Sequence, residues 1–181
     1  MMTLKTTLTA LSLAGAALLS QTASATDISN PVTALTFDAD GAAFFGQLFT
    51  GHNEGNTFND KYTFSLSGLN NVTADLFSYS GNPKNGLDIT SLDLFTSGGT
   101  LIKHGTQLST GQTDQWTLTS NGLGTANYYL QISGSVLSNA AGQYTAGATA
   151  TPAAAVPEPE TYGMLLGGLA VMGLIARRRK A

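Results

Sequence analysis

Apolar and polar residues alternate with a period of two through most of residues 26–149. The alternation is clear in TFSLSG and TADLFSY, and it returns in DITSLDLF, DQWTLTS, NYYLQISGSV and QYTAGATA. Such a period places apolar side chains on one face of a β-strand and polar side chains on the other. Turn-forming groups rich in Gly, Asn and Ser separate these stretches. The pattern predicts strands at residues 34–38, 43–49, 63–68, 73–79, 88–95, 114–120, 127–136 and 143–150.

Short strands at this spacing, without a long helical period, predict an all-β domain at residues 26–149. We expect an antiparallel β-sandwich of jelly-roll type. Composition agrees, because only 10% of the residues are charged and 21 are Gly. Solvent-facing helices need Glu, Lys and Arg, whereas polar turns between strands use Gly, Ser and Asn.

The first 25 residues have the three parts of a secretory signal peptide. Lys5 supplies positive charge, an apolar helical core follows, and Ala23-Ser24-Ala25 forms a small-residue cleavage site. We expect signal peptidase to cut between Ala25 and Thr26. This implies export through the general secretion machinery.

The other end of the chain contains an uncharged apolar run at residues 162–176, after a linker at residues 150–161. As a helix this run spans roughly 22 Å, less than the roughly 30 Å of bilayer hydrocarbon. A buried core helix is the alternative, since apolar runs of this length are common in cores. The basic residues that follow favour a transmembrane helix with a cytoplasmic tail at residues 162–181.

The tail combines three parts in a fixed order. These are a Pro-Glu-Pro motif, the apolar run and a basic stop, at Val156, Pro157, Glu158, Pro159 and then Arg177, Arg178, Arg179, Lys180. This order resembles the PEP-CTERM sorting signal of exported proteins in Gram-negative bacteria that make exopolysaccharide. The resemblance implies that exosortase, an integral-membrane cysteine protease, recognises the motif and cuts nearby. It also implies a transient anchor in the inner membrane, then release to the cell surface or extracellular matrix, with exopolysaccharide as a further candidate partner.

A second motif lies in FNDKY, which contains Phe58, Asp60 and Tyr62. It resembles the FxDxF motif that names one group of PEP-CTERM proteins, with Tyr62 in place of the final Phe. The surrounding strands resemble bacterial pre-peptidase C-terminal domains, which are small β-sandwiches appended to secreted enzymes. On a continuous strand the three side chains share one face with Phe64. Asp60 must then bind either backbone N–H groups of a neighbouring loop or a calcium ion, because an unpaired buried carboxylate is strongly unfavourable.

Other candidate metal ligands are few. Asp38 and Asp40 have the DxDG spacing that begins some calcium loops, but the pattern equally suits a turn with Asx hydrogen bonds. His52 lies in a glycine-rich loop, and His104 ends a short apolar strand. We interpret both histidines as solvated loop residues rather than ligands of one metal site.

The sequence argues against several classes of function. Without cysteine there is no disulfide, thiolate nucleophile or cysteine-ligated metal. Residues 26–155 contain three basic and nine acidic side chains, a net charge of −6, so nucleic acid is not expected as a partner. We assign no catalytic residue, cofactor or metal site, and we expect a non-enzymatic protein with a structural or adhesive role in exopolysaccharide or biofilm. The alternative is a secreted carbohydrate-binding or polysaccharide-active protein, with candidate sugar-stacking residues Trp116, Tyr79, Tyr128 and Tyr129.

Overall fold

The computed structural model describes residues 24–153 and 159–178. The chain divides into two compact units, one ending at Thr151 and the other beginning at Pro152. The first unit contains ten strands: β1 (Thr33–Ala34), β2 (Ala42–Phe49), β3 (Thr57–Leu66), β4 (Asn70–Tyr79), β5 (Leu87–Thr96), β6 (Leu101–His104), β7 (Thr106–Ser109), β8 (Thr113–Leu123), β9 (Ala126–Val136) and β10 (Gly142–Pro152).

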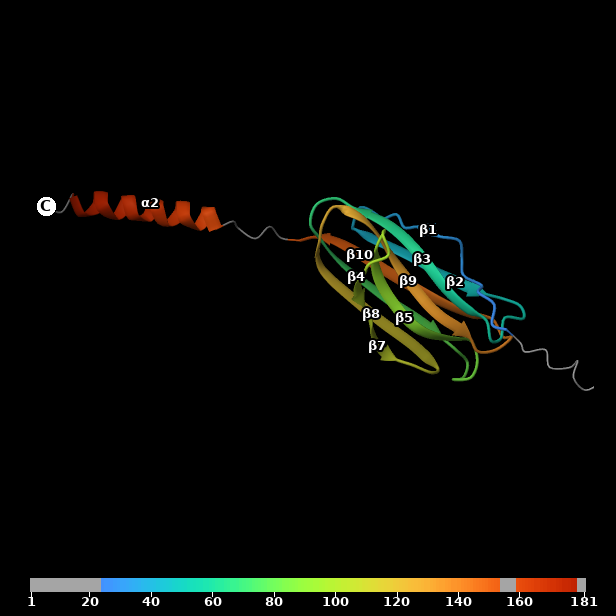
Figure 1. The fold of residues 1–181 in the computed structure, drawn as a ribbon. Helices are drawn as coiled ribbons and strands as arrows, with labels where there is room; N and C mark the ends of the chain where they lie inside the picture. The colour runs from blue at the N-terminus through green and yellow to red at the C-terminus, as the bar shows by residue number, and fades with distance from the viewer. Residues whose placement is uncertain (1–23, 154–158, 179–181) are drawn as a thin grey trace, which may run out of the picture. The chain divides into compact units, whose positions relative to one another are not determined.

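These strands form two sheets that face each other as the layers of a sandwich (Figure 1). Sheet A has the order β1-β3-β9-β5-β6, and sheet B has the order β2-β10-β4-β8-β7. Neighbouring strands pair antiparallel in β3–β9, β5–β9, β5–β6, β2–β10, β4–β8 and β7–β8, whereas the short β1 is parallel to β3. Successive strands from β2 to β5, and again from β8 to β10, alternate between the two sheets. This alternation confirms the predicted jelly-roll sandwich.

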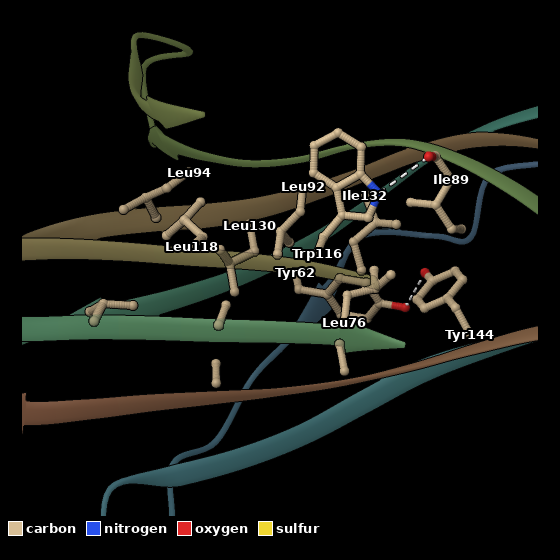
Figure 2. Close-up of a cluster of buried hydrophobic side chains, with 14 of the residues drawn as sticks. Tyr62, Leu76, Ile89, Leu92, Leu94, Trp116, Leu118, Leu130, Ile132 and Tyr144 are labelled. Atoms are coloured by element: carbon tan, nitrogen blue, oxygen red, sulfur yellow. Dashed lines mark hydrogen bonds between the residues drawn. The ribbon is translucent and has the colours of Figure 1, made fainter. Parts of the chain in front are cut away.

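Side chains that alternate along the strands fill the space between the sheets. In β3 every second residue is buried, and the pairing of Asp60 with Ile132 sets the register against β9. Figure 2 shows side chains from both sheets meeting in this core, with Leu76 and Leu118 from sheet B opposite Leu92 and Leu130 from sheet A. The period-two pattern therefore arises because one face of each strand is buried against the other sheet.

The predicted strand at residues 34–38 is wrong beyond its first residue. Thr33 and Ala34 pair with β3, and the Leu35 N–H still donates to the Thr63 carbonyl at 2.7 Å. The chain then passes to the other sheet, where β2 begins. Phe37, in this connection, packs edge-on against Phe64 with ring centroids 5.6 Å apart. Its half-buried side chain packs against the core from a loop. An alternation of apolar and polar residues therefore occurs here without a strand.

One edge of the sandwich is closed by a segment that changes sheets at Gly105. β6 pairs with β5 in sheet A, and β7 pairs with β8 in sheet B, with Gly105 alone between them. The Gly105 N–H donates to the Leu92 carbonyl at 2.8 Å. A Cβ atom at this position would lie 2.6 Å from the Leu92 carbonyl oxygen and 3.2 Å from that of Thr117. Only glycine allows the backbone to approach both sheets so closely.

The second unit contains the helix α2 (Pro159–Arg178). It is longer at both ends than the uncharged run at residues 162–176. Among the described residues no helix is both long enough and apolar enough to be assigned as a membrane span. The transmembrane crossing therefore stays a prediction. The expected signal helix lies outside the described residues.

Candidate functional site

The sorting segment begins where the sandwich sequence ends. β10 runs to Pro152, and α2 begins at Pro159, the last residue of the Pro-Glu-Pro motif. Proline suits the first position of a helix, because the N–H it lacks would have no partner within the helix. The helix ends at Arg178, where a cation complements the partial negative charge of the terminal carbonyl groups.

Some of the expected sorting residues lie outside the described residues, namely Val156, Pro157, Glu158, Arg179 and Lys180. Within α2, large apolar side chains are exposed at successive positions, including Met164, Leu165 and Leu166, and the same holds for Leu169, Val171, Met172 and Ile175. Successive residues of a helix point about 100° apart, so these side chains surround the axis instead of forming one stripe. A helix that is apolar on all sides is typical of segments covered by other apolar matter.

At the opposite end of the sandwich sequence, the first residue after the expected cleavage site is held to β3. The Thr26 N–H donates to Asn56 Oδ1 at 3.0 Å, and the Thr57 N–H donates to the Thr26 carbonyl at 3.0 Å. Ile28 continues this contact through its N–H to the Thr57 carbonyl at 2.9 Å. Residues 1–23, Ala23 among them, lie outside the described residues, so cleavage between Ala25 and Thr26 stays a prediction.

The motif residues Phe58, Asp60 and Tyr62 lie on one face of β3, and all three are buried. The Phe58 ring stacks on Tyr144 of β10 with centroids 5.9 Å apart, and it lies 4.6 Å from the Phe49 ring of β2. The three motif side chains therefore belong to the core between the two sheets. Asp60 places one carboxyl group among the aromatic rings there.

Asp60 accepts hydrogen bonds from two directions. Its Oδ1 accepts the Asn30 N–H at 2.6 Å, and its Oδ2 accepts the Tyr144 hydroxyl, which lies 2.8 Å from the Tyr62 hydroxyl (Figure 2 marks this last contact). Burial raises the pKa of Asp60 above its ordinary value, and the bonds from Tyr144 and Asn30 oppose part of that rise. The first of the two interpretations is confirmed, since Asp60 binds a backbone N–H of the loop that precedes β1.

Sequence reasoning missed the partner of this carboxyl. Tyr144 is 84 residues away from Asp60 along the chain. The alternation in QYTAGATA indicates that the Tyr144 side chain faces the core, but no local pattern indicates what it meets there. Burial and the bond to Asp60 also raise the pKa of Tyr144, so its hydroxyl stays protonated.

The DxDG segment forms a turn whose hydrogen bonds come from its own backbone. Asp38 Oδ1 accepts the N–H groups of Asp40 at 3.0 Å and Ala42 at 2.8 Å, and the Gly41 N–H donates to the Asp38 carbonyl at 3.0 Å. Gly41 has a φ of 76°, a conformation that favours glycine. Residues 24–153 and 159–178 contain no group of three His, Cys, Asp or Glu side chains placed to hold a metal ion. The Asx turn accounts for this motif.

The histidines are not placed alike. His52 lies in the loop between β2 and β3, as expected. His104 is exposed, as expected, but it is the last residue of β6 and not a loop residue, and its Nδ1 contacts the buried carboxylate of Asp93 on the neighbouring strand. The His104 ring also lies edge-on to Trp116 at a centroid distance of 6.0 Å. The cross-strand pairing of Asp93 with His104 brings them together, and sequence spacing alone does not indicate it.

Two of the four candidate sugar-stacking residues are unavailable for that role. Trp116 and Tyr128 are buried and donate to carbonyl groups, the Trp116 Nε1–H to Ile89 at 3.2 Å and the Tyr128 hydroxyl to Gly124 at 2.9 Å (Figure 2 includes the first). Tyr129 is partly covered, because it stacks on Phe95 at 5.0 Å with the Lys61 ammonium 5.3 Å from its ring centroid.

Tyr79 is exposed on the outer face of sheet B. Phe44 and Phe77 are exposed on the same face, although sequence reasoning did not select them. The signal that could have found them is an aromatic residue at a position where the alternation expects a polar one. Asp75, Gln115 and Thr145 line a shallow hollow beside these two rings.

Comparisons with known proteins identify one segment. A model of the PEP-CTERM protein-sorting motif matches residues 155–180. No curated protein matches this chain. Among solved structures, the chain is similar to the pre-peptidase C-terminal domain of a collagenase from Bacillus anthracis, at 16% identity and a TM-score of 0.38, over 70% of this chain and 95% of that one.

Two further solved structures are also similar to this chain. One is PliG of Aeromonas hydrophila, a periplasmic inhibitor of g-type lysozyme, at 14% identity and a TM-score of 0.41, over 69% of this chain and 99% of that one. The other is a β-glucosidase from Paenibacillus barengoltzii, at 15% identity and a TM-score of 0.27, over 68% of this chain and 13% of that one. Residues 155–180 thus carry a PEP-CTERM protein-sorting motif, which implies an exported protein that exosortase sorts.

Proposed function

We propose that the chain is a non-enzymatic cell-surface or extracellular-matrix protein with a structural or adhesive role in exopolysaccharide or biofilm. The observation that carries the proposal is the match of residues 155–180 to the PEP-CTERM motif. In this proposal α2 anchors the exported chain in the inner membrane until exosortase cuts near the Pro-Glu-Pro motif, and the sandwich is the part delivered.

The properties of the segment support this order of events. Two prolines around Glu158 disfavour helix before Pro159 and favour an extended backbone, the form that proteases bind. The exposed apolar side chains of α2 suit lipid, and the basic residues at its end suit the cytoplasmic side of the membrane. Snorkelling of long basic side chains and local thinning of the bilayer would accommodate the short apolar run.

The use of the carboxylates supports a role without catalysis. Asp38 and Asp60 accept backbone N–H groups, and the buried Asp114 accepts those of Ile89 and Gly111, each at 3.2 Å. These carboxyl groups hold turns and loops in place, so they are not a pair poised to act as acid and base on a glycosidic bond.

The test is mass spectrometry of the C-terminus of the protein from cells with and without exosortase. We expect the residues that follow the motif to be lost only when exosortase is present. A Pro157→Ala/Glu158→Ala variant should keep Ala181 in both strains, whereas Pro152→Ala, which changes a proline outside the matched segment, should be cut like the natural chain. An intact Ala181 on the natural chain in both strains would overturn the proposal.

Carbohydrate binding is the second candidate function, and the outer face of sheet B favours it. Phe44, Phe77 and Tyr79 are exposed there beside polar groups that can bind hydroxyls, and the flat face of an aromatic ring suits the C–H groups of a pyranose. Retention of the protein on neutral polysaccharide should then fall in Phe77→Ala and Tyr79→Ala but not in Tyr129→Ala, on the other sheet. Equal retention of all three variants would exclude this face as the binding site.

A further inference from the structure

The backbone of β2 has an open side. β2 is the last strand of sheet B, and in the described part of the chain its pairing partner is β10 alone. Backbone groups of an edge strand that point away from the sheet are free to pair with another strand. Most edge strands are shielded by charge, proline or a covering segment, whereas β2 reads AAFFGQLF and contains neither charge nor proline.

Alternation along the strand identifies the residues that face the open side. The Gly41 carbonyl accepts the Ala150 N–H at 2.8 Å, which places the groups of the odd-numbered residues toward β10. The groups of Ala42 point the other way, since its N–H donates to Asp38 Oδ1 and its carbonyl accepts the Asp38 N–H. In an antiparallel ladder the direction alternates. Phe44, Gly46 and Leu48 therefore direct their N–H and carbonyl groups to the open edge. The Gly46 carbonyl also accepts the Tyr62 hydroxyl at 3.4 Å, which leaves its second lone pair for another strand.

The side chains of these residues lie on the outer face of the sheet. Phe44 is 85% exposed and Leu48 is 58% exposed, and Gly46 between them adds no bulk. A Cβ at Gly46 would lie 2.5 Å from the Tyr144 carbonyl oxygen, so any other residue at this position would clash with β10 of the same chain. The result is an apolar pair placed symmetrically about a glycine.

We propose that β2 pairs antiparallel with β2 of a second copy of this chain, about a two-fold axis at Gly46. In this register Gly46 faces Gly46 of the second copy, and Phe44 faces its Leu48 on both sides of the axis. Each facing pair exchanges two backbone hydrogen bonds, about six in all. Centring the axis on a neighbouring residue would use fewer open groups, because those of Ala42 are already bonded to Asp38.

The two-fold register favours a copy of the same strand over another partner. Such an interface is self-complementary, because Phe44 of each copy faces Leu48 of the other. It places the Cα atom of Phe44 about 5.5 Å from the Cα atom of Leu48 in the other copy, whereas the two Cα atoms are about 13 Å apart within one strand. It also joins two sheets into one continuous sheet and covers an edge that would otherwise be prone to aggregation. The proposal goes beyond the sorting and matrix roles and does not depend on either.

Disulfide trapping tests the register. The natural chain has no cysteine, so only the introduced cysteines can form a disulfide. Full-length Phe44→Cys and Leu48→Cys proteins, purified in detergent, are oxidised separately and as a mixture. We expect a covalent dimer in the mixture only, because facing Cα atoms lie within the roughly 4.4–6.8 Å that a disulfide spans, while identical positions lie too far apart. Phe77→Cys mixed with Leu48→Cys is the control from an interior strand of the same face.

Three results would overturn the proposal. The first is that the mixture of Phe44→Cys and Leu48→Cys gives no covalent dimer. The second is that each single variant gives as much covalent dimer as the mixture, as open-ended aggregation would. The third is that the control mixture with Phe77→Cys gives as much covalent dimer. A glycan or an unrelated protein on the edge gives the first of these results. The unprocessed chain is used throughout, so failure of exosortase processing leaves the outcome unchanged.

A matched pair of charge variants provides a second, independent measurement. Leu48→Glu places a carboxylate at the proposed interface, whereas Leu108→Glu places one on β7 at the opposite edge of the same sheet. The two leucines are equally exposed, at 58% and 57%. Sedimentation of the detergent-purified chain should show loss of the dimer in Leu48→Glu and its retention in Leu108→Glu. A dimer that survives Leu48→Glu, or that both variants lose, would also overturn the proposal.

Discussion

Replacement of Tyr144 by Phe removes one hydroxyl from the core and keeps the ring. That hydroxyl donates to Asp60 and lies 2.8 Å from the Tyr62 hydroxyl, while the ring stacks on Phe58. The variant therefore tests the hydrogen bonds of the buried carboxyl with little change in apolar packing. Tyr62→Phe is the matched control, because its hydroxyl bonds to neutral groups, among them the Tyr144 hydroxyl and the Gly46 carbonyl.

The expected magnitudes differ because the two hydroxyls serve different groups. A hydrogen bond to a charged group contributes about 1.5–3 kcal/mol, and one between neutral groups contributes about 1 kcal/mol. We expect Tyr144→Phe to lower the free energy of unfolding by about 2–3 kcal/mol near neutral pH, and Tyr62→Phe by about 1 kcal/mol. The Asn30 N–H remains on Asp60 in both variants, so neither should abolish folding.

The effect of Tyr144→Phe should also depend on pH. Burial raises the pKa of Asp60 in the folded state, so the stability that this group contributes is present in full below its unfolded pKa. That contribution is lost as pH rises through the raised folded pKa. Removing the Tyr144 hydroxyl raises the folded pKa of Asp60 further. The destabilisation should therefore be largest above this pKa and should shrink as pH is lowered toward the unfolded value of about 3.9.

Urea denaturation of the processed protein measures these differences. Trp116 is the only tryptophan of the chain and is buried, so its fluorescence reports unfolding of the core. A change in the midpoint at constant slope gives the change in stability. Equal destabilisation by Tyr144→Phe and Tyr62→Phe, or a larger effect of Tyr144→Phe at pH 5 than at pH 8, would refute this account of the Asp60 site.

Three other predictions follow from the sandwich. Gly105→Ala should lower stability by about 2–3 kcal/mol, because its Cβ would meet the Leu92 carbonyl oxygen at 2.6 Å, and an unchanged melting temperature would contradict the sheet-switching role of this glycine. EDTA should leave the melting temperature unchanged, because the Asp38 carboxylate already accepts two backbone N–H groups, whereas a fall would reveal a bound cation. Burial raises the pKa of Asp60 and of Asp114, so Asp60→Asn and Asp114→Asn should each gain stability relative to the natural chain as pH rises from the unfolded value of about 3.9 through the raised folded pKa, and a relative loss in urea denaturation would reverse the assigned sign.

Much of this protein could be predicted from its sequence because the signals are local. A period of two indicates a strand and the face that it buries, and it correctly placed Phe58, Asp60 and Tyr62 together on the inner face of β3. The sorting motif is contiguous, so its three parts could be recognised in linear order, and the matched segment agrees. Short segments carry weaker signals. β6 and β7 have four residues each, too few for an alternation to be read, and β7 was not predicted.

The tertiary structure decided which strands meet, and therefore which groups pair. Tyr144 reaches Asp60 because β10 and β3 lie in facing sheets, and His104 reaches Asp93 because β6 lies beside β5. The open edge of β2 is likewise a consequence of strand order, since the same alternating sequence in an interior strand would have both sides paired. Alternation reports the side of a strand that is buried, whereas pairing depends on contacts between residues far apart in the chain, which no local pattern encodes.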